Sequence, residues 1–250
     1  MKKNIIILFL LPVILMAQPQ LKLMTFNIYH GENRKGKIDL NVLAEIINKE
    51  NPDVVGLQEV DFNTGRSGKI DIALELAYKT GMIPLFARAM NYDGGEYGIA
   101  ILTKYSIIKS EVFNLTKFKN YEQRVALRVN VKIGEDTLAF LTTHLDYHED
   151  DTLRFLQIKD LINIVKQIKY PLFLLGDLND VPESRAIRLL SQQFEMDKPA
   201  LLSFPCPTPE KKIDYILKKT HEWVLKNEYI VESENASDHC AVVAEFEKTD

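Results

Sequence analysis

The sequence predicts an α/β fold in which β-sheets are covered by helices. Short, strongly apolar runs bounded by Gly, Pro or Asn recur along the chain, and stretches with the apolar spacing of helices stand between some of them. The chain has 250 residues, of which 46% are hydrophobic, so it is long enough for one large domain with a sizeable core. It contains no internal repeat, low-complexity tract or linker that would divide this domain.

The first half of the chain combines strands with two helices. Strands are predicted at residues 21–28, 54–57, 83–89 and 99–102. The first helix follows Asp39, whose side chain can cap it, and stops at Asn51-Pro52. The second covers residues 71–80 and ends at Gly81, which suits a left-handed helix terminus.

The second half is organised around the run PLFLLGDLND at residues 171–180. Residues 172–175 predict a strand buried on both faces, and Gly176 then ends it before a group of polar residues. Further strands are predicted at residues 107–113, 125–133, 137–142, 213–217 and 240–246, helices at 152–168 and 183–190, and a loop at 198–212.

The N-terminus has the pattern of a cleavable signal peptide. Lys2 and Lys3 precede an apolar run over residues 5–16, and Ala17 offers a small residue for cleavage. The run is too short for a comfortable membrane span, and a retained anchor is the alternative. We therefore expect residues 1–17 to be a signal peptide, residues 18–250 to form the domain, and the protein to be secreted or periplasmic.

Charge and cysteine content narrow the function classes. Loss of Lys2 and Lys3 would take the formal net charge from −4 to −6, so the chain lacks the basic footprint of a non-specific nucleic-acid binder. Cys206 and Cys240 could pair in an oxidising compartment. Because Cys240 stands directly before an apolar run, we expect a buried free thiol instead.

Polar groups recur at the ends of the apolar runs, which suggests that they line one shared active-site opening, here called the mouth. They are Asn27, Glu59, Glu96, His144, Asp177, Asn179, Asp214, Asp238 and His239. Oxygen donors of this kind suit Mg²⁺ or Mn²⁺ better than a closed zinc site, and a bound hard cation beside two histidines suits phosphoester hydrolysis. The simpler alternative for Asp177 and Asn179 is a capped turn. The chain has neither a Gly-x-Ser-x-Gly elbow nor a nucleotide-binding glycine loop.

Seven motifs occur in order along the chain: TFNIYHG, DVVGLQEV, GGEYGIAIL, TTHLD, LLGDLND, KIDYIL and SDHCAV. With them the chain resembles the endonuclease/exonuclease/phosphatase superfamily of metal-dependent phosphohydrolases, over residues 21–247. The phrases FNTGRSGKIDIALELA and ARAMNYDGGEYG also resemble an exported bacterial subgroup. The resemblance implies a four-layered α/β sandwich, in which two packed mixed β-sheets are flanked by helices.

The same resemblance implies the metal site and the proton acceptor. Glu59, Asn27 and Asp238 would bind Mg²⁺ or Mn²⁺. His239 would accept a proton from the attacking water, with its tautomer set by Asp214.

For the substrate, the resemblance implies that Asp177 and Asn179 orient the nucleophile and the scissile phosphate. His144 would bind a phosphate oxygen or protonate the leaving oxygen, and Glu96 would fix His144. Arg66 and Arg124 are further candidates, and Arg66 could bind a phosphate or carboxylate through two hydrogen bonds or be a plain surface arginine.

Four other residues carry smaller expectations. His30 follows Asn27 closely enough to approach the mouth, whereas His148 and His221 are expected in solvent. Ile99 stands where many relatives carry Asn, and this difference bears on the substrate class rather than on catalysis.

We therefore expect a secreted, metal-dependent hydrolase of phosphoester bonds, similar to phosphodiesterases and nucleases, in which water attacks phosphorus in line. The alternatives are a small-molecule or inositol-type phosphatase and a non-catalytic binding protein with the same fold. The substrate would be nucleic acid or a small phosphorylated molecule. We expect a monomer without stable membrane insertion. No apolar hairpin suited to docking on lipid is evident, which weakens a sphingomyelinase-like function.

Overall fold

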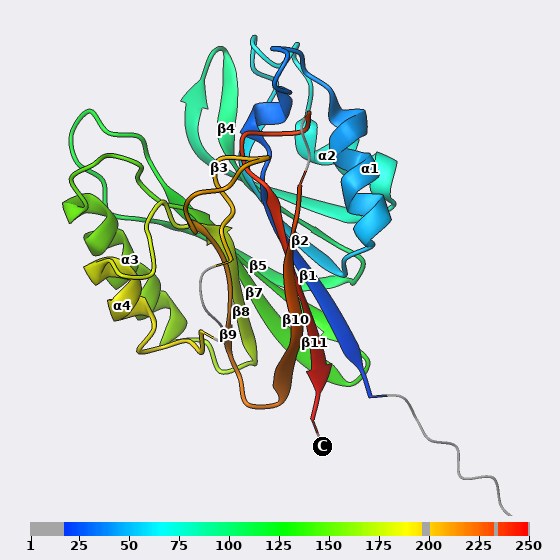
Figure 1. Ribbon diagram of the computed structural model, residues 1–250, viewed down its shortest axis with the longest axis vertical. Coiled ribbons are helices and arrows are strands. Elements are labelled where there is room, and N and C mark those ends of the chain that lie inside the picture. Colours follow the sequence, from blue (N-terminus) through cyan, green and yellow to red (C-terminus); the bar gives the residue numbers. More distant parts are fainter. Residues whose placement is uncertain (1–17, 197–200, 233–234, 250) are drawn as a thin grey trace, which may run out of the picture.

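The apolar strands of the chain pair into two β-sheets that pack face to face (Figure 1). The computed structural model describes residues 18–196, 201–232 and 235–249. The predicted signal peptide at residues 1–17 lies outside the described residues. None of the described helices combines the length and the apolar character needed to cross a membrane.

The six-stranded sheet has the order β10-β11-β1-β2-β4-β3. Its strands are β1 (Gln20–Asn27), β2 (Val54–Phe62), β3 (Ile83–Tyr92), β4 (Gly95–Thr103), β10 (Trp223–Val231) and β11 (Ala241–Lys248). It is a mixed sheet, because β1 and β2 are parallel and the other neighbours are antiparallel.

The five-stranded sheet has the order β5-β6-β7-β8-β9. Its strands are β5 (Ile107–Asn114), β6 (Val125–Ile133), β7 (Asp136–His144), β8 (Leu172–Asp177) and β9 (Asp214–Lys219). Here only β7 and β8 are parallel. Strand β8 is buried along its whole length, as its apolar sequence predicts.

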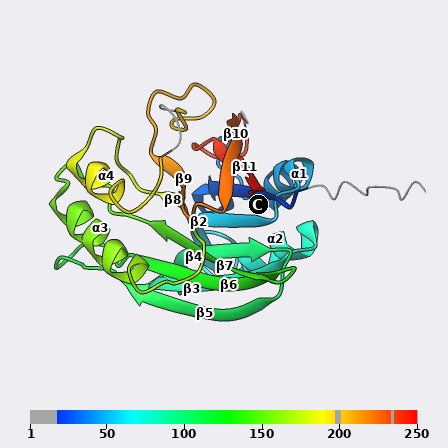
Figure 2. The ribbon, with the colours of Figure 1, turned by 90° about the horizontal axis from the view of Figure 1, so that it is seen from below.

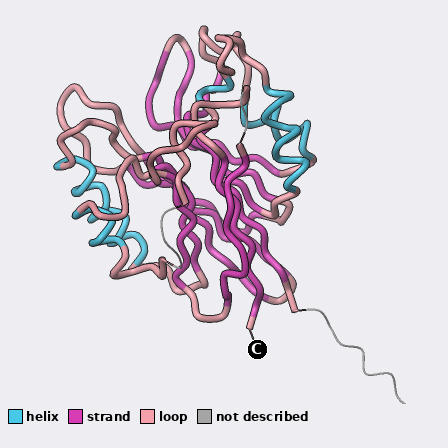
Figure 3. Tube along the Cα trace, viewed as in Figure 1, coloured by secondary structure: helices cyan, strands magenta, loops and turns pink. Residues whose placement is uncertain are grey.

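Helices cover the outer face of each sheet, which confirms the predicted four layers (Figures 2 and 3). The helices α1 (Leu40–Glu50) and α2 (Ile72–Thr80) share a buried cluster with the six-stranded sheet. The helices α3 (Thr152–Val165) and α4 (Arg185–Leu190) do the same with the five-stranded sheet. Between the sheets, Phe173 packs against Phe140, Phe246 and Trp223 with ring centroids 5.6, 5.0 and 6.4 Å apart.

Local sequence signals set the helix ends. The Asp39 side chain accepts a hydrogen bond from the Asn41 amide, and Gly81 closes α2 with a φ of 68°. The fourth helix begins at Arg185 rather than at residue 183, because the Ser184 side chain caps it. Strand β10 was not predicted, because a register shift between Leu225 and Asn227 interrupts its alternation, and the short 3₁₀ helix η1 (Tyr29–Gly31) was also missed.

The expectation of a free thiol was wrong, because Cys206 and Cys240 form a disulfide. The loop at residues 201–213 folds onto the start of β11, where the Cys206 amide donates to Asp238 O at 2.7 Å and the Cys240 amide donates to Ser203 O at 2.9 Å. These backbone contacts bring the two Cα atoms to 5.0 Å. A pairing across 34 residues depends on this loop fold, which the apolar run after Cys240 does not reveal.

Strand register gathers the polar strand ends at one edge of the molecule. His144 at the end of β7 pairs with Asp177 at the end of β8, and Asp177 pairs with Asp214 at the start of β9. Asn27 ends β1 in the other sheet. Because β9 runs antiparallel to β8, its first residue lies at the same edge as the last residue of β8.

Candidate active site

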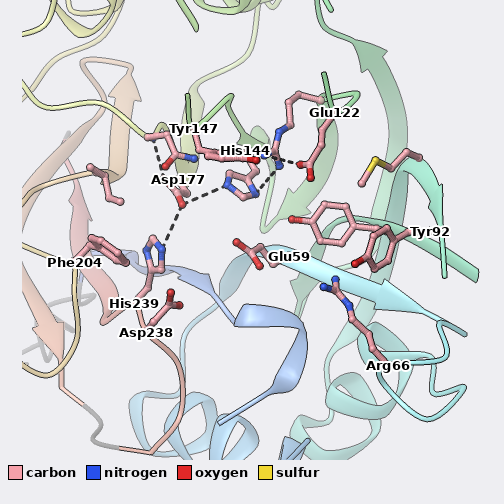
Figure 4. A pocket seen from close by; sticks show the side chains of 15 residues that line it. Glu59, Arg66, Tyr92, Glu122, His144, Tyr147, Asp177, Phe204, Asp238 and His239 are labelled. Atoms are coloured by element: carbon pink, nitrogen blue, oxygen red, sulfur yellow. Dashed lines mark hydrogen bonds and ion pairs between the residues drawn. The ribbon is translucent and has the colours of Figure 1, made fainter. Parts of the chain in front are cut away.

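The gathered strand ends border a cavity of about 320 Å³ (Figure 4). Its lining residues are Glu59, Arg66, Met90, Tyr92, Tyr97, Glu122, Arg124, His144, Tyr147, Asp177, Asn179, Phe204, Ile213, Asp238 and His239. Both sheets and the disulfide-linked loop contribute to it. The structure therefore brings most of the sequence-predicted residues to one place.

His239 is bound from behind by a buried carboxylate. Its Nδ1 lies 3.0 Å from Asp214 Oδ2, which also accepts a 2.6 Å hydrogen bond from Ser203 Oγ. The Phe204 ring packs against the imidazole with centroids 4.7 Å apart. Burial alone would lower the pKa of His239, but the carboxylates Asp214 and Asp177 outweigh it and raise the pKa to about 10.

Asp177 lies between the two histidines of the cavity. Its Oδ2 is 3.5 Å from His144 Nε2 and 3.6 Å from His239 Nε2 (Figure 4). The same oxygen accepts a 3.1 Å hydrogen bond from Asn27 Nδ2. Its Oδ1 accepts from the Asn179 amide at 2.9 Å. Burial, followed by the nearby Asp214 charge, raises the pKa of Asp177 to about 7.

His144 has a cationic neighbour instead. Arg124 Nη1 lies 3.0 Å from His144 Nδ1, and because a guanidinium only donates, the imidazole nitrogen must accept. The ring proton of neutral His144 is thereby assigned to Nε2, the nitrogen that faces Asp177. Burial and the Arg124 charge hold the pKa of His144 well below its usual range.

Glu59 is turned into the cavity by an irregularity in β2. Pairing with β4 shifts between Leu57 and Val60, and Glu59 itself has a φ of 58°, in the left-handed region. Such a bulge re-aims one side chain, and a non-glycine residue held at positive φ is typical of functional sites. Burial alone would raise the pKa of the Glu59 carboxyl, but contacts from His30, His144 and Asn27 outweigh it and lower the pKa to about 2.

The cavity offers oxygen donors that suit a divalent cation. Glu59 remains ionised, and Asp238 is a second cavity-lining carboxylate whose pKa is raised by burial. Asn27 is differently placed from the expected ligand, because its Nδ2 donates to Glu59 Oε1 at 3.1 Å and its Oδ1 accepts from the Tyr29 amide at 3.1 Å. Asn27 thus orients the Glu59 carboxylate.

A second group also has metal-binding geometry. Ligand atoms of Asp177, Asp214 and His239 lie within 4.8 Å of one another. Asp214 Oδ2 is already hydrogen-bonded to His239 and to Ser203, however. Glu59 and Asp238 are therefore the carboxylates of the cavity that could hold a cation without breaking the Asp214–His239 pair.

One predicted role is wrong. Glu96 does not fix His144: its carboxylate pairs with Arg88 at 3.1 Å, and it does not line the cavity. Arg124 instead takes the position on His144 Nδ1. Asn179 reaches the cavity from a turn at a φ of 51° rather than from the strand, with its Nδ2 donating to Leu145 O at 3.0 Å.

The remaining histidines differ from one another. His30 is buried beside the mouth, with Nδ1 3.9 Å from Glu59 Oε2. His148 is more constrained than predicted, because its ring packs between Tyr121 and Tyr147 and its Nδ1 lies 2.9 Å from Asp146 Oδ1. The His221 side chain is 99% exposed, as predicted.

Sequence reasoning missed several residues of the site. Ser203 and Phe204 come from a loop that carries no motif, and Glu122 and Tyr147 have no signal that separates them from ordinary surface residues. Tyr97 was also missed, although it stands inside the motif GGEYGIAIL, which could have marked it. Ile99 is buried between the sheets and does not line the cavity, so its effect on the site is indirect.

Comparisons with known proteins agree with this fold. The sequence model described as "Endonuclease/Exonuclease/phosphatase family" matches residues 24–239. An endonuclease/exonuclease/phosphatase from Bacteroides vulgatus is 20% identical, with 93% of this chain and 100% of that chain covered at a TM-score of 0.76. The catalytic domain of human Nocturnin with bound sulfate is 20% identical, with 92% and 94% covered at 0.73. A mannosyl-6-phosphatase from Bacteroides thetaiotaomicron is 15% identical, with 90% and 99% covered at 0.67.

Proposed function

The chain belongs to the endonuclease/exonuclease/phosphatase family, and on that premise we propose that it is a metal-dependent hydrolase of phosphoester bonds. Members of this family are generally phosphoester hydrolases and are typically dependent on a divalent metal. One observation carries the proposal: His239, held from behind by Asp214, lines a single cavity together with Asp177 and the bulged Glu59. These groups can hold a cation, a phosphate and a water at once.

Glu59 and Asp238 are the residues that would hold Mg²⁺ or Mn²⁺. Bound there, the cation would offset the negative charge that develops on the phosphate and favour ionisation of water. All remaining chemistry belongs to side chains of the chain itself.

His239 is the group we assign to move the proton of the attacking water. Its Nδ1–H donates to Asp214, which fixes the ring and directs Nε2 toward the cavity. The raised pKa favours the protonated ring in the metal-free protein, so the ring must first lose this proton before it can accept one from water. Positive charge bound at Glu59 and Asp238 would promote that loss.

His144 has the protonation state of a hydrogen-bond donor. Because its pKa lies well below the usual range, it is neutral at pH 7 and offers Nε2–H to a phosphate oxygen. This favours phosphate binding over protonation of the leaving oxygen. Asp177, whose pKa is raised to about 7 and whose Oδ2 lies near His239 Nε2, can hold a proton at pH 7 and is the better candidate for the leaving side.

We also propose that the protein is exported. The N-terminal pattern of residues 1–17 supports this, and so does the Cys206–Cys240 disulfide, because disulfides persist mainly in oxidising compartments. A fusion of residues 1–30 to a reporter that is active only after export would test this, and no export would overturn it.

The hydrolase is tested by measuring phosphate-ester cleavage in Mg²⁺, in Mn²⁺ and in EDTA. The panel should hold plasmid DNA, RNA, bis-p-nitrophenyl phosphate, inositol phosphates and sphingomyelin. We expect turnover that requires the metal, and a Glu59→Gln variant with weaker cation binding and roughly a 100-fold loss of activity. Binding of Mg²⁺ is measured separately by calorimetry.

Glu96→Gln is the matched control, because Glu96 is a glutamate of β4 that lies outside the cavity. It should retain both the cation affinity and the activity of the parent. A folded parent that binds Mg²⁺ but cleaves no panel member would favour the non-catalytic alternative. Equal Mg²⁺ affinity in Glu59→Gln and the parent would overturn the metal assignment.

A further inference from the structure

The cavity has a second wall that the proposed chemistry does not use. Arg66 and Tyr92 lie on the other side of Glu59 from His239 and Asp238 (Figure 4). Tyr97 also belongs to this wall. None of the three contacts the residues assigned to proton transfer, yet all of them line the same cavity.

Arg66 is held in one orientation. Its Nε and Nη2 each donate a 2.8 Å hydrogen bond to the two oxygens of Asp61, which is fully buried. The guanidinium also lies over the rings of Tyr92 and Tyr97, at 4.5 and 5.5 Å from their centroids. The buried carboxylate therefore fixes the plane of the guanidinium through two parallel hydrogen bonds.

The loop that carries Arg66 is itself held in place by hydrogen bonds. Asp93 Oδ2 accepts the Arg66 amide at 2.6 Å, and a Cβ at Gly65 would lie only 2.7 Å from the same oxygen. Asp61 accepts a further 2.6 Å hydrogen bond from Thr64 Oγ1. The loop and the β3–β4 hairpin therefore form one rigid unit behind the guanidinium.

One edge of the guanidinium remains open to the cavity. Asp61 occupies Nε and one proton of Nη2, and no described residue contacts Nη1 by a hydrogen bond. A planar edge of this kind can donate two hydrogen bonds to a ligand in fixed geometry. Arg66 is thus preorganised to bind the part of a substrate that extends beyond the scissile phosphate.

Charge balance indicates what that part is. Asp61 compensates Arg66, and Glu122 compensates Arg124 at 2.9 Å, so neither arginine of the cavity brings a net positive charge. The cavity presents donors on Arg66, acceptor oxygens on Glu122 and aromatic rings. A second phosphate or carboxylate would be repelled by Glu122, whereas a hydroxyl group can both donate and accept.

The volume of the cavity also favours a small substrate. A cavity of about 320 Å³ is at the lower end of the range for small-molecule sites, and the formal net charge of the chain is −4. A polynucleotide would need an extended basic surface beside the cavity. One ring together with one phosphate is a better match.

From these observations we propose that Arg66 and the aromatic wall bind the uncharged, hydroxyl-rich leaving group of a small phosphorylated polyol, such as a sugar or a cyclitol. The inference rests on the proposed hydrolase activity. Water would form the new bond to phosphorus, the bond from phosphorus to the polyol oxygen would break, and that oxygen would take up a proton. Arg66 determines specificity and does not touch the reacting phosphorus.

The test compares kcat/KM for sugar and inositol monophosphates with kcat/KM for bis-p-nitrophenyl phosphate in the Mn²⁺-loaded full chain. We expect the parent to prefer a phosphorylated polyol, and Arg66→Ala to reduce this preference about 10- to 100-fold, mainly through KM. Arg66→Lys keeps a cation beside Asp61 but lacks the open planar edge, so it should lose most of the preference while remaining folded. Arg88→Ala is the matched control, because Arg88 is an exposed arginine of β3 outside the cavity, and it should behave as the parent.

The outcomes separate the two proposals. Metal-dependent cleavage with no preference for polyols, or a preference that Arg66→Lys and Arg66→Ala leave intact, would overturn this inference alone. A preference for sugar bisphosphates over monophosphates that disappears in Arg66→Ala would replace the hydroxyl site with an anion site and also overturn it. Absence of metal-dependent cleavage of every phosphoester would overturn the hydrolase and this inference together.

Discussion

His144 and His239 face the same carboxylate from the two sheets, yet they are held in opposite protonation states. Both are almost fully buried, and their Nε2 atoms lie 3.5 and 3.6 Å from Asp177 Oδ2. The difference lies at Nδ1, where His144 meets Arg124 and His239 meets Asp214, each at 3.0 Å. One pKa is held well below the usual range and the other is raised to about 10.

The difference between these two equally buried histidines is decided by the charge of the partner at Nδ1. Burial lowers the pKa of both rings. Arg124 adds to that effect at His144, whereas Asp214 and Asp177 overcome it at His239. A site with one neutral donor and one proton carrier results from two identical side chains.

The largest effect is expected when the proton carrier is removed. His239→Ala should lower kcat roughly 100- to 10,000-fold, because no other described group is placed by Asp214 to accept a proton from water. Steady-state cleavage of the best phosphoester measures this. His221→Ala, which removes a histidine that is 99% exposed, should leave kcat at the parent's value. A loss below tenfold in His239→Ala would assign the proton transfer elsewhere.

The Cys206–Cys240 disulfide holds the loop that packs on His239, whereas His144 has no such cross-link beside it. Replacing both cysteines, Cys206→Ser with Cys240→Ser, should lower the free energy of unfolding by roughly 3 to 4 kcal/mol, because the bridge spans 34 residues. It should also lower kcat, since Cys240 follows His239 directly and the bridged loop carries Phe204. Urea unfolding and kcat are the measurements, and unchanged values of both would contradict a supporting role.

The raised pKa of His239 makes a stability prediction with a definite sign. Its pKa is about 10 in the folded state and 6.5 ordinarily, so protonation stabilises the fold fully below pH 6.5 and this contribution is lost as the pH rises through 10. In EDTA, between about pH 7.5 and 9.5, the parent should lose about 1.4 kcal/mol per pH unit more than His239→Gln. The slopes are compared in the upper part of this window, because loss of the His239 charge raises the pKa of Asp177 in the variant. Equal slopes in parent and variant would refute the raised pKa.

Removing the Arg124 guanidinium beside His144 should make the pKa values of His144 and His239 more similar. In Arg124→Ala the pKa of His144 should rise toward its ordinary value, because the guanidinium no longer donates to Nδ1. Activity at pH 7 should fall about 10- to 100-fold, and more at lower pH as His144 becomes protonated. Ring-proton NMR titration follows the pKa directly. Arg128→Ala, which removes an arginine bound to Glu111 on the same sheet, is the control that should leave His144 unchanged.

Much of the fold was predictable because its signals are local. Apolar runs placed strands such as β6 and β8, and the caps Asp39 and Gly81 placed helix ends. These features depend on residues that are neighbours in sequence. Strand β10 escaped detection because its partner β11 is what orders it, across a register shift between Leu225 and Asn227.

The fold class, the strands that end in polar residues and the family marked by the motifs could all be read from the amino-acid sequence. Four features depend on how the chain folds in space: the Cys206–Cys240 disulfide, the bulge that turns Glu59, the opposite protonation of His144 and His239, and the orientation of Arg66. They depend on the fold because the residues involved are far apart along the chain. Asn27 contacts Asp177 across 150 residues and His239 across 212, and hydrogen bonding and electrostatics act through space, where register and loop packing decide which charge meets which side chain.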